Sequence, residues 1–238
     1  MANILKKIYH GAFGTSEERL IKKLKKGGIL GDGCKFFEPR TVCIDLQRPH
    51  MLHIGNYCKV CRGVTILAHD YSRSVVIQYL HDNIGEAGMT WIGDNVFIGM
   101  NATILMGAHI GDNSIVGAGA VVSGKYPDNS VIAGNPARVI CTIEEFSAKR
   151  KSKALDEAAL YANSWKMKYG EYPSISKMGN AFSWLYLPHT QETIDQYPNF
   201  FLLSGVENQQ LKKDFLATKP EFEDFECFLE YCENSSWK

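Results

Sequence analysis

The side chains of this 238-residue chain that could carry chemistry are its seven cysteines and its seven histidines. Cys58 and Cys61 have the spacing of a metal or redox pair, but no second pair completes such a site. We therefore interpret the cysteines as reduced thiols, which are typical of a cytoplasmic protein. An imidazole has a pKa near neutrality and can act as a general base. A lone histidine is more often a surface residue, so position in the fold must decide.

The composition limits the function classes. The chain is 45% hydrophobic and 22% charged, as expected for a globular protein with a substantial core. Its 26 basic and 26 acidic residues cancel, so the charge predicts no nucleic-acid partner. Residues 1–30 carry seven Lys/Arg against two Glu, which favours one solvated helix face; a weak association with a membrane surface is the alternative. Neither a membrane span nor a signal peptide is predicted.

A six-residue period is the strongest structural signal. Starting from Ile92, every sixth residue is β-branched: Ile92, Ile98, Ile104, Ile110, Val116 and Val122. The position four residues after each is small until the last one. The same register fits upstream at Leu30, Phe36, Val42, Ile54, Val60 and Ile66, with Arg48 as the exception. Cys34 and Cys58 fall at the small position, so we expect both thiols to point into the core.

This period has a simple physical meaning, which is a three-sided coil. Three short strands joined by tight corners make one turn of about 18 residues, and turns stack at about 4.8 Å. Each buried β-branched side chain contributes about 1.5–3 kcal/mol. Gly111-Asp112-Asn113 is typical of a corner because these residues tolerate positive φ. Local rules favour right-handed crossovers, but recurrent hexads of this kind resemble the left-handed parallel β-helix. We therefore expect a mainly β fold of that type.

Two segments flank this register and one interrupts it. Thr15-Ser-Glu-Glu18 opens a basic amphipathic helix that Gly27 ends, within an N-terminal segment 1–29. Residues 30–140 are expected to form the β-helix, with 71–89 as a protruding loop, because the register is lost there. So long a loop is typically functional. Thr142 opens a longer helix that runs to about Tyr169, in a mainly helical extension 141–238.

Three segments resemble the hexapeptide-repeat acetyltransferases, and among them the maltose, galactoside and polysaccharide O-acetyltransferases. They are Trp91–Gly99, Gly117–Val122 and Gly134–Ile140. The likeness covers about residues 30–140 and is strongest from 91 to 140. It implies an O-acetyltransferase that moves an acetyl group from acetyl-CoA to a hydroxyl of a sugar or cell-surface polysaccharide precursor. No metal is implied.

The resemblance also implies which residue acts as the base. Members of this family place a histidine near the edge of the coil just before the loop, where this chain has His69. The imidazole would take the proton of the acceptor hydroxyl as that oxygen attacks the thioester. His81, inside the loop, is the alternative base. On the acceptor side we expect Asp70, Tyr71, Ser72, Arg73 and His81.

For acetyl-CoA, the resemblance implies a groove between two subunits. The matching residues are Met100, Ala118, Ser123, Lys125 and Arg138. Arg138 would meet a CoA phosphate with a charge-assisted bond. The family often has Thr-Lys where this chain has Ser123-Gly124, so Lys125 stands one residue late. Met100 replaces a hydroxyl residue of relatives, which leaves its backbone N–H to support the oxyanion of the thioester.

A groove between subunits implies a homotrimer with direct transfer in a ternary complex, in which His69 of one chain faces the donor residues of a neighbour. Three alternatives stay open at this point. The acceptor could be a small molecule such as a streptogramin-type drug. The protein could be a trimeric scaffold without catalysis. A metal-dependent carbonic anhydrase on this fold would need converging histidines, which the spacing does not show.

Overall fold

The computed structural model describes residues 15–203 and 206–234. The chain divides into two compact units, Met1–Phe146 and Ser147–Lys238. Among the described residues, no helix has the length and apolar character needed to span a bilayer. All seven cysteines are free thiols.

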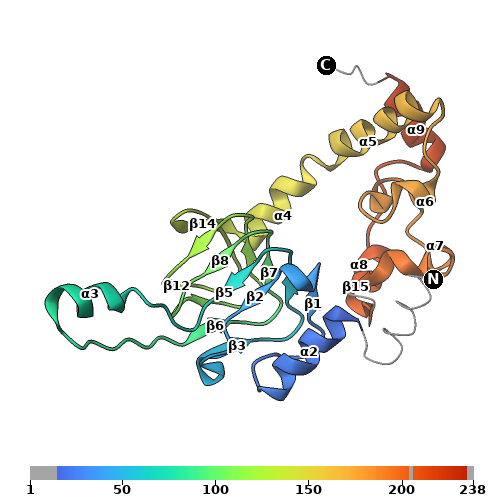
Figure 1. Ribbon diagram of the computed structural model, residues 1–238. Helices are drawn as coiled ribbons and strands as arrows, with labels where there is room; N and C mark the ends of the chain where they lie inside the picture. Colours follow the sequence, from blue (N-terminus) through green and yellow to red (C-terminus); the bar gives the residue numbers. More distant parts are fainter. Residues whose placement is uncertain (1–14, 204–205, 235–238) are drawn as a thin grey trace, which may run out of the picture. The chain divides into compact units, whose positions relative to one another are not determined.

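The first unit is built from three sheets of mostly very short strands, which are parallel except for the last pair, β13 and β14 (Figure 1). One contains, in spatial order, β1 (Lys35–Phe36), β4 (Lys59–Val60), β7 (Phe97–Ile98), β10 (Ile115–Val116), β13 (Ser130–Gly134) and β14 (Ala137–Thr142). The second contains β11 (Val121–Val122), β8 (Thr103–Ile104), β5 (Thr65–Ile66) and β2 (Cys43–Ile44). The third contains β12 (Lys125–Tyr126), β9 (His109–Ile110), β6 (Thr90–Ile92) and β3 (Leu52–Ile54). From β1 to β10, each strand pairs with the third strand after it, so the chain visits the three sheets in turn.

The predicted register explains this stacking. Ile54 pairs in register with Ile92, and Ile92 with Ile110, so identical β-branched side chains lie above one another. All six register positions from Ile92 to Val122 are fully buried. Cys34 and Cys58 are also buried in this core, as predicted. The hydrophobic gain of each layer therefore comes from the same inward column.

Asparagine and aspartate side chains hold the corners together. Asn95 and Asn113 adopt positive φ of 55° and 52°, which asparagine tolerates better than most residues. The Asn95 side-chain amide donates to Asn113 Oδ1 at 3.0 Å in the next turn of the coil. The Asp112 carboxylate likewise accepts the Asp94 N–H at 2.7 Å. The repeated Gly-Asp-Asn therefore satisfies corner N–H groups that no strand partner reaches.

The upstream register was wrong at Val42, and Arg48, its exception, also lies outside the strands. Ile44, not Val42, pairs with Ile66, and both Val42 and Arg48 are only partly buried. Two 3₁₀ turns cause the difference, η1 (Pro39–Thr41) and η2 (Pro49–Met51). They place Ile44 eight residues after Phe36 and ten before Ile54. The extra residues of the two turns together equal one hexad. Ile54 therefore falls on the predicted six-residue register again.

The N-terminal helix α2 (Ser16–Lys26) packs within the first unit. Its predicted capping box is present, with Thr15 and Glu18 bonding reciprocally, and Gly27 ends it. Leu24 is fully buried in the core of the coil. The Glu17 carboxylate accepts the backbone N–H of Phe36 at 2.8 Å. The helix thus covers the first turn and satisfies part of the exposed edge strand β1.

The stretch without the register contains a helix, α3 (Arg73–Leu80), that projects from the coil (Figure 1). None of its residues is buried. Val75 and Tyr79 are 69% and 81% exposed, so the described part of the chain leaves these two side chains uncovered.

The predicted helix from Thr142 to Tyr169 is two helices, α4 (Ile143–Lys151) and α5 (Ala154–Tyr169). The capping box is present, because Thr142 Oγ1 accepts the Glu145 N–H at 3.2 Å and the Glu145 carboxylate accepts the Thr142 N–H at 2.9 Å. The break comes at residues 152–153, where the Ser152 hydroxyl donates to the Lys149 carbonyl at 3.0 Å. Such bonds compete with the helical backbone pattern, so one helix becomes two.

The second unit is mainly helical around an aromatic core. Tyr186 and Phe228 are fully buried in it and stack at 5.0 Å between ring centroids. Its further elements are α6 (Ile175–Met178), η3 (Ser183–Leu185), α7 (Gln191–Gln196), η4 (Pro198–Phe201), β15 (Leu202–Leu203), β16 (Val206–Glu207), α8 (Gln209–Leu216) and α9 (Phe225–Asn234).

Candidate active site

His69 and Asp45 form a hydrogen-bonded pair where two neighbouring strands end. Strand β2 pairs in parallel with β5, with Ile44 opposite Ile66, so the segments that follow the two strands leave the sheet together. His69 Nδ1 bonds to Asp45 Oδ2. The carboxylate also accepts the N–H groups of Gln47 at 3.0 Å and Ala68 at 3.1 Å.

This pairing fixes the histidine for one role. The side chains of Asp45 and His69 are 7% and 14% exposed, so both are held largely out of water. A carboxylate accepts only, so Nδ1 carries the proton and Nε2 keeps its lone pair. Nε2 is then free to take a proton from a ligand hydroxyl. The arrangement is that of a base oriented by a carboxylate.

The carboxylate that orients the ring stays ionised. Burial raises the pKa of Asp45, but the N–H of Gln47, the His69 ring and the N–H of Ala68 outweigh it. The net result is a pKa below the ordinary aspartate value.

Sequence reasoning missed Asp45, because the assumed register placed Val42 and Arg48 on the strand. The available signal was Pro39 and Pro49, which open the two turns that isolate Cys43–Asp45.

Asp70 shapes the start of the projecting segment. Its carboxylate accepts both the N–H and the hydroxyl of Ser72, at 2.8 and 2.6 Å. These bonds lower its pKa, with smaller contributions from Glu86 and His69. The structure therefore gives the role of orienting the ring to Asp45 and leaves Asp70 at the rim.

Three other predicted acceptor-side residues lie at different depths. The Tyr71 ring stands edge-on to His69, with 5.2 Å between centroids and an angle of 82°. Arg73 is the first residue of α3 and is partly exposed. His81 follows the last turn of α3 in a left-handed conformation and is exposed. Among the hydrogen bonds of the described residues, none orients the His81 ring as Asp45 orients His69.

Glu86 is a further candidate that sequence reasoning missed. Its Oε1 is buried and has no hydrogen-bond partner among the described residues. Its backbone carbonyl accepts from Arg48 at 2.9 Å, which holds the returning end of the segment against the coil. Its carboxyl group lies close to that of Asp70 and contributes to the lowered pKa of Asp70. Glu86 Oε1 lacks a donor, so this rim suits a ligand that carries hydroxyl groups.

The predicted donor residues divide between two corners of the coil. Met100 and Ala118 follow the paired strands β7 and β10, and Met100 O accepts the Gly119 N–H at 2.8 Å. Arg138 lies on β14 in the same sheet, exposed, with one guanidinium N–H donating to the Ala137 carbonyl. Ser123 follows β11 of the second sheet, as His69 follows β5. One chain therefore brings Met100, Ala118 and Arg138 to a different corner from His69.

Lys125 begins β12 in the third sheet and is exposed, immediately past the corner that carries Ser123. It pairs in register with His109. The rings of His53, Trp91 and His109 stack along the same sheet, at 3.7 and 6.1 Å between centroids. These two histidines are part of a structural column. In the described part of the chain, no group of three or more His, Cys, Asp or Glu side chains is placed to hold a metal ion.

Comparison with known proteins shows which family has this architecture. The model of the hexapeptide repeat of succinyl-transferase matches residues 90–123. The chain is 37% identical over 110 residues to YvoF of Bacillus subtilis (strain 168), provisionally named an acetyltransferase; the match covers 46% of this chain and 59% of YvoF. It is 38% identical over 97 residues to the galactoside O-acetyltransferase of Escherichia coli (strain K12), covering 39% of this chain and 48% of that enzyme. It thus spans less than two thirds of either relative.

The match to protein CapG of Staphylococcus aureus is more complete. It has 37% identity over 128 residues and covers 53% of this chain and 73% of CapG. The chain therefore belongs to the hexapeptide-repeat acyltransferase family.

Proposed function

We propose that the chain is an acetyl-CoA-dependent O-acetyltransferase with His69 as its general base. The hydrogen-bonded pair of His69 and Asp45 is the observation that supports this best. His69 Nε2 takes the proton of the acceptor hydroxyl while that oxygen bonds to the thioester carbonyl carbon. The C–S bond then breaks, and the proton on Nε2 passes to the departing thiolate of CoA. The proton of the hydroxyl and the electron pair of the C–S bond both end on the thiol of CoA, so the step requires neither an acyl-enzyme nor a metal.

The acceptor that we propose is a hydroxyl of a sugar or of a cell-surface polysaccharide precursor, in the cytoplasm. The rim at Glu86 supports this class, because a hydroxyl group of the acceptor supplies the donor that Glu86 Oε1 lacks. Tyr71, edge-on to His69, adds an aromatic surface on which a sugar ring can stack. The galactoside specificity of one relative points to the same class. An activity confined to streptogramin-type drugs in an acceptor panel would reject it.

We also propose that the coil winds left-handed, as in the family, and that the working unit is a homotrimer. The division of donor residues between two corners supports a shared site, because Met100, Ala118 and Arg138 belong to the first sheet and the corner after it, whereas His69 follows the second sheet. A neighbouring chain would bring them together. Analytical ultracentrifugation tests the trimer, and a monomer with full activity would reject it.

Replacing Arg138 with alanine is expected to raise the KM for acetyl-CoA several-fold with a smaller change in kcat. A phosphate contact remote from the thioester stabilises ground and transition states alike. Arg138→Lys keeps the charge and should show an intermediate KM. Steady-state kinetics measure both constants, and Lys149→Ala, which removes an exposed charge on α4, is the matched control. An unchanged KM in Arg138→Ala would remove this residue from the donor site.

Excising α3 tests the acceptor side. Replacing residues 73–85 with a short Gly-Ser link should leave the Tm and CoA affinity nearly unchanged, because no α3 residue is buried. The Asp70 and Glu86 side chains are in contact, so a short link can join the two ends. Transfer to the acceptor should be lost, while slow hydrolysis of acetyl-CoA persists. Thermal melting, calorimetry with CoA and release of free thiol measure these three properties. Undiminished transfer would show that the segment does not border the acceptor.

A further inference from the structure

Helix α2 packs against the first turn of the coil and is fixed there at two points (Figure 1). Near its start, the Glu17 carboxylate accepts the N–H of Phe36 at 2.8 Å. Near its end, Lys25 forms an ion pair with Asp32. Phe36 and Asp32 both belong to the first turn, so the helix lies across this end of the coil and cannot turn its outer face inward.

The outer face of α2 is a basic stripe. Leu24, on the inner side, is fully buried. Four basic residues recur at the three- and four-residue spacing of one helix face, namely Arg19, Lys22, Lys23 and Lys26. The three lysines are exposed, and none of them forms an ion pair with a residue that the structure describes. Their charges therefore face solvent together.

The charge of the first unit is divided along the coil. Residues 15–62 carry ten Lys/Arg against five Asp/Glu, whereas residues 63–146 carry three against eight. The carboxylates near α2 are engaged within the unit: Glu17 bonds to a backbone N–H, Glu18 belongs to the capping box, and Asp32 pairs with Lys25. A negatively charged surface is therefore attracted to the end that carries α2 and repelled by the rest of the unit.

An exposed tyrosine occupies a strained position at a corner of the same end. In later turns of the coil this corner holds Asn95, Asn113 and Asn129, all at positive φ. The second turn has Tyr57 there, with a φ of 58°, which costs a bulky side chain more than it costs asparagine. Its ring is 56% exposed and lies over Gly33, where an added Cβ would come within 2.4 Å of the ring. The fold alone would favour asparagine here, so the exposed ring calls for another explanation.

Exposed aromatic rings flank α2 at both of its ends. Tyr57 lies beside the last turn, because its N–H donates at 2.7 Å to the carbonyl of Asp32, the partner of Lys25. Phe37, which is 51% exposed, lies beside the first turn, because Glu17 bonds to the N–H that precedes it. Lysines and aromatic rings together suit the surface of an anionic bilayer, where the ammonium groups meet lipid phosphates and the rings enter the interface.

We propose that this end of the coil binds the surface of an anionic phospholipid bilayer. The basic stripe of α2 lies on the headgroups, and Tyr57 and Phe37 enter the interface on either side of it. A bilayer fits better than nucleic acid, because rings at opposite ends of an 11-residue helix, about 16 Å long, cannot stack on neighbouring bases. The surface is separate from the acetyl-transfer site, so His69→Ala should bind vesicles as the parent protein does.

Vesicle flotation with the full-length protein tests this proposal. Vesicles of phosphatidylcholine with about one third phosphatidylglycerol should carry the protein, and vesicles of phosphatidylcholine alone should not. Raising the salt to about 0.5 M should weaken binding by about tenfold or more, because the Debye length falls below about 5 Å. Equal flotation on both kinds of vesicle would overturn the proposal. Complete displacement by a DNA duplex of equal total charge would also overturn it, in favour of nucleic acid.

Removing two charges from the stripe gives the sharpest readout. Lys22→Gln combined with Lys26→Gln should weaken binding to the anionic vesicles by about tenfold or more. Both side chains are exposed, so the Tm should change little. Undiminished vesicle binding by this double variant would contradict the role of the stripe.

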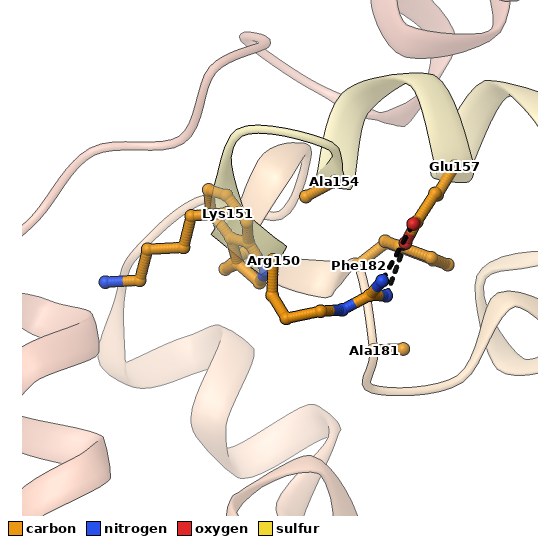
Figure 2. A pocket seen from close by; sticks show the side chains of 7 residues that line it. Arg150, Lys151, Ala154, Glu157, Ala181 and Phe182 are labelled. Atoms are coloured by element: carbon orange, nitrogen blue, oxygen red, sulfur yellow. Dashed lines mark hydrogen bonds and ion pairs between the residues drawn. The ribbon is translucent and has the colours of Figure 1, made fainter. Parts of the chain in front are cut away.

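Helix α4 supplies the matched control, because it carries a basic run of its own. Arg150 bonds there to both carboxylate oxygens of Glu157, at 2.9 and 2.5 Å, so its charge is compensated (Figure 2). Lys151 extends away from this pair, and Lys149 is exposed (Figure 2). Lys149→Gln combined with Lys151→Gln removes the same net charge and should leave vesicle binding unchanged. Equal losses in the two double variants would show that only net charge matters, against the proposal.

Tyr57→Asn separates a membrane role of the ring from a structural one. It introduces the residue type of the later corners, so the Tm should not fall, whereas binding to anionic vesicles should weaken several-fold. Tyr79→Asn removes an exposed ring from α3 and should bind vesicles like the parent protein. A lower Tm with unchanged vesicle binding in Tyr57→Asn would show that this ring serves packing alone and would remove it from the proposed surface.

Discussion

Replacing His69 with alanine is expected to lower the rate of acetyl transfer by about 10²–10⁴-fold, the usual cost of losing a general base. The affinity for CoA and the Tm should change little. The ring lies past the end of β5 and outside the hydrophobic core, and Asp45 keeps its bonds to the N–H groups of Gln47 and Ala68. Release of free CoA with a panel of sugars measures the rate, and calorimetry measures CoA binding.

Two other histidine variants complete that experiment. His81→Ala removes the alternative base, and it should retain most of the activity because no described hydrogen bond orients the His81 ring. His50→Ala removes an exposed imidazole from a 3₁₀ turn of the coil and serves as the matched control. Activity that survives in His69→Ala and disappears in His81→Ala would show that the base has been wrongly assigned.

The parts of the fold that the sequence predicts are those whose signal repeats. From Ile92 to Val122 the hexads have no insertion, and every register position is buried as expected. The corners follow for the same reason, because the side chain of Asp112 satisfies a backbone group of the preceding turn. Capping boxes at Thr15 and Thr142 are local signals, and both are present. Repetition and local chemistry can be read without knowledge of tertiary contacts.

The parts that were missed depend on insertions and on contacts between distant residues. Two turns that together add one hexad left the apparent period intact, so nothing in the spacing exposed the error at Val42. Asp45 became visible only with the pairing of β2 and β5. Glu86 meets Asp70 because the projecting segment returns to its starting point, which no local pattern encodes. In the second unit, the Tyr186 hydroxyl has no hydrogen-bond partner among the described residues, and no local pattern predicts this.

Replacing Asp45 with asparagine is expected to lower the transfer rate on the order of 10²-fold or more, with little change in the KM for acetyl-CoA. Three donors face the Asp45 carboxylate, namely the N–H groups of Gln47 and Ala68 and His69 Nδ1. Asparagine offers only one acceptor oxygen, and its NH₂ group faces the donors that this oxygen does not reach. Where that NH₂ faces the ring, Nδ1 must accept, the proton moves to Nε2, and the base is lost.

The same substitution has a signature in the pH dependence of stability. The pKa of Asp45 is lowered in the folded protein, so its ionisation stabilises the fold above the unfolded value of about 3.9. That contribution is lost as the pH falls through the folded value. Asp45→Asn should therefore lose less stability on acidification than the parent protein, as measured by thermal melting between neutral and acidic pH. Asp32→Asn, which removes an exposed carboxylate of the same unit, should behave like the parent in both kinetics and melting. If Asp45→Asn kept full activity and an unchanged acid profile, Asp45 would be neither the residue that orients His69 nor an ionised buried partner.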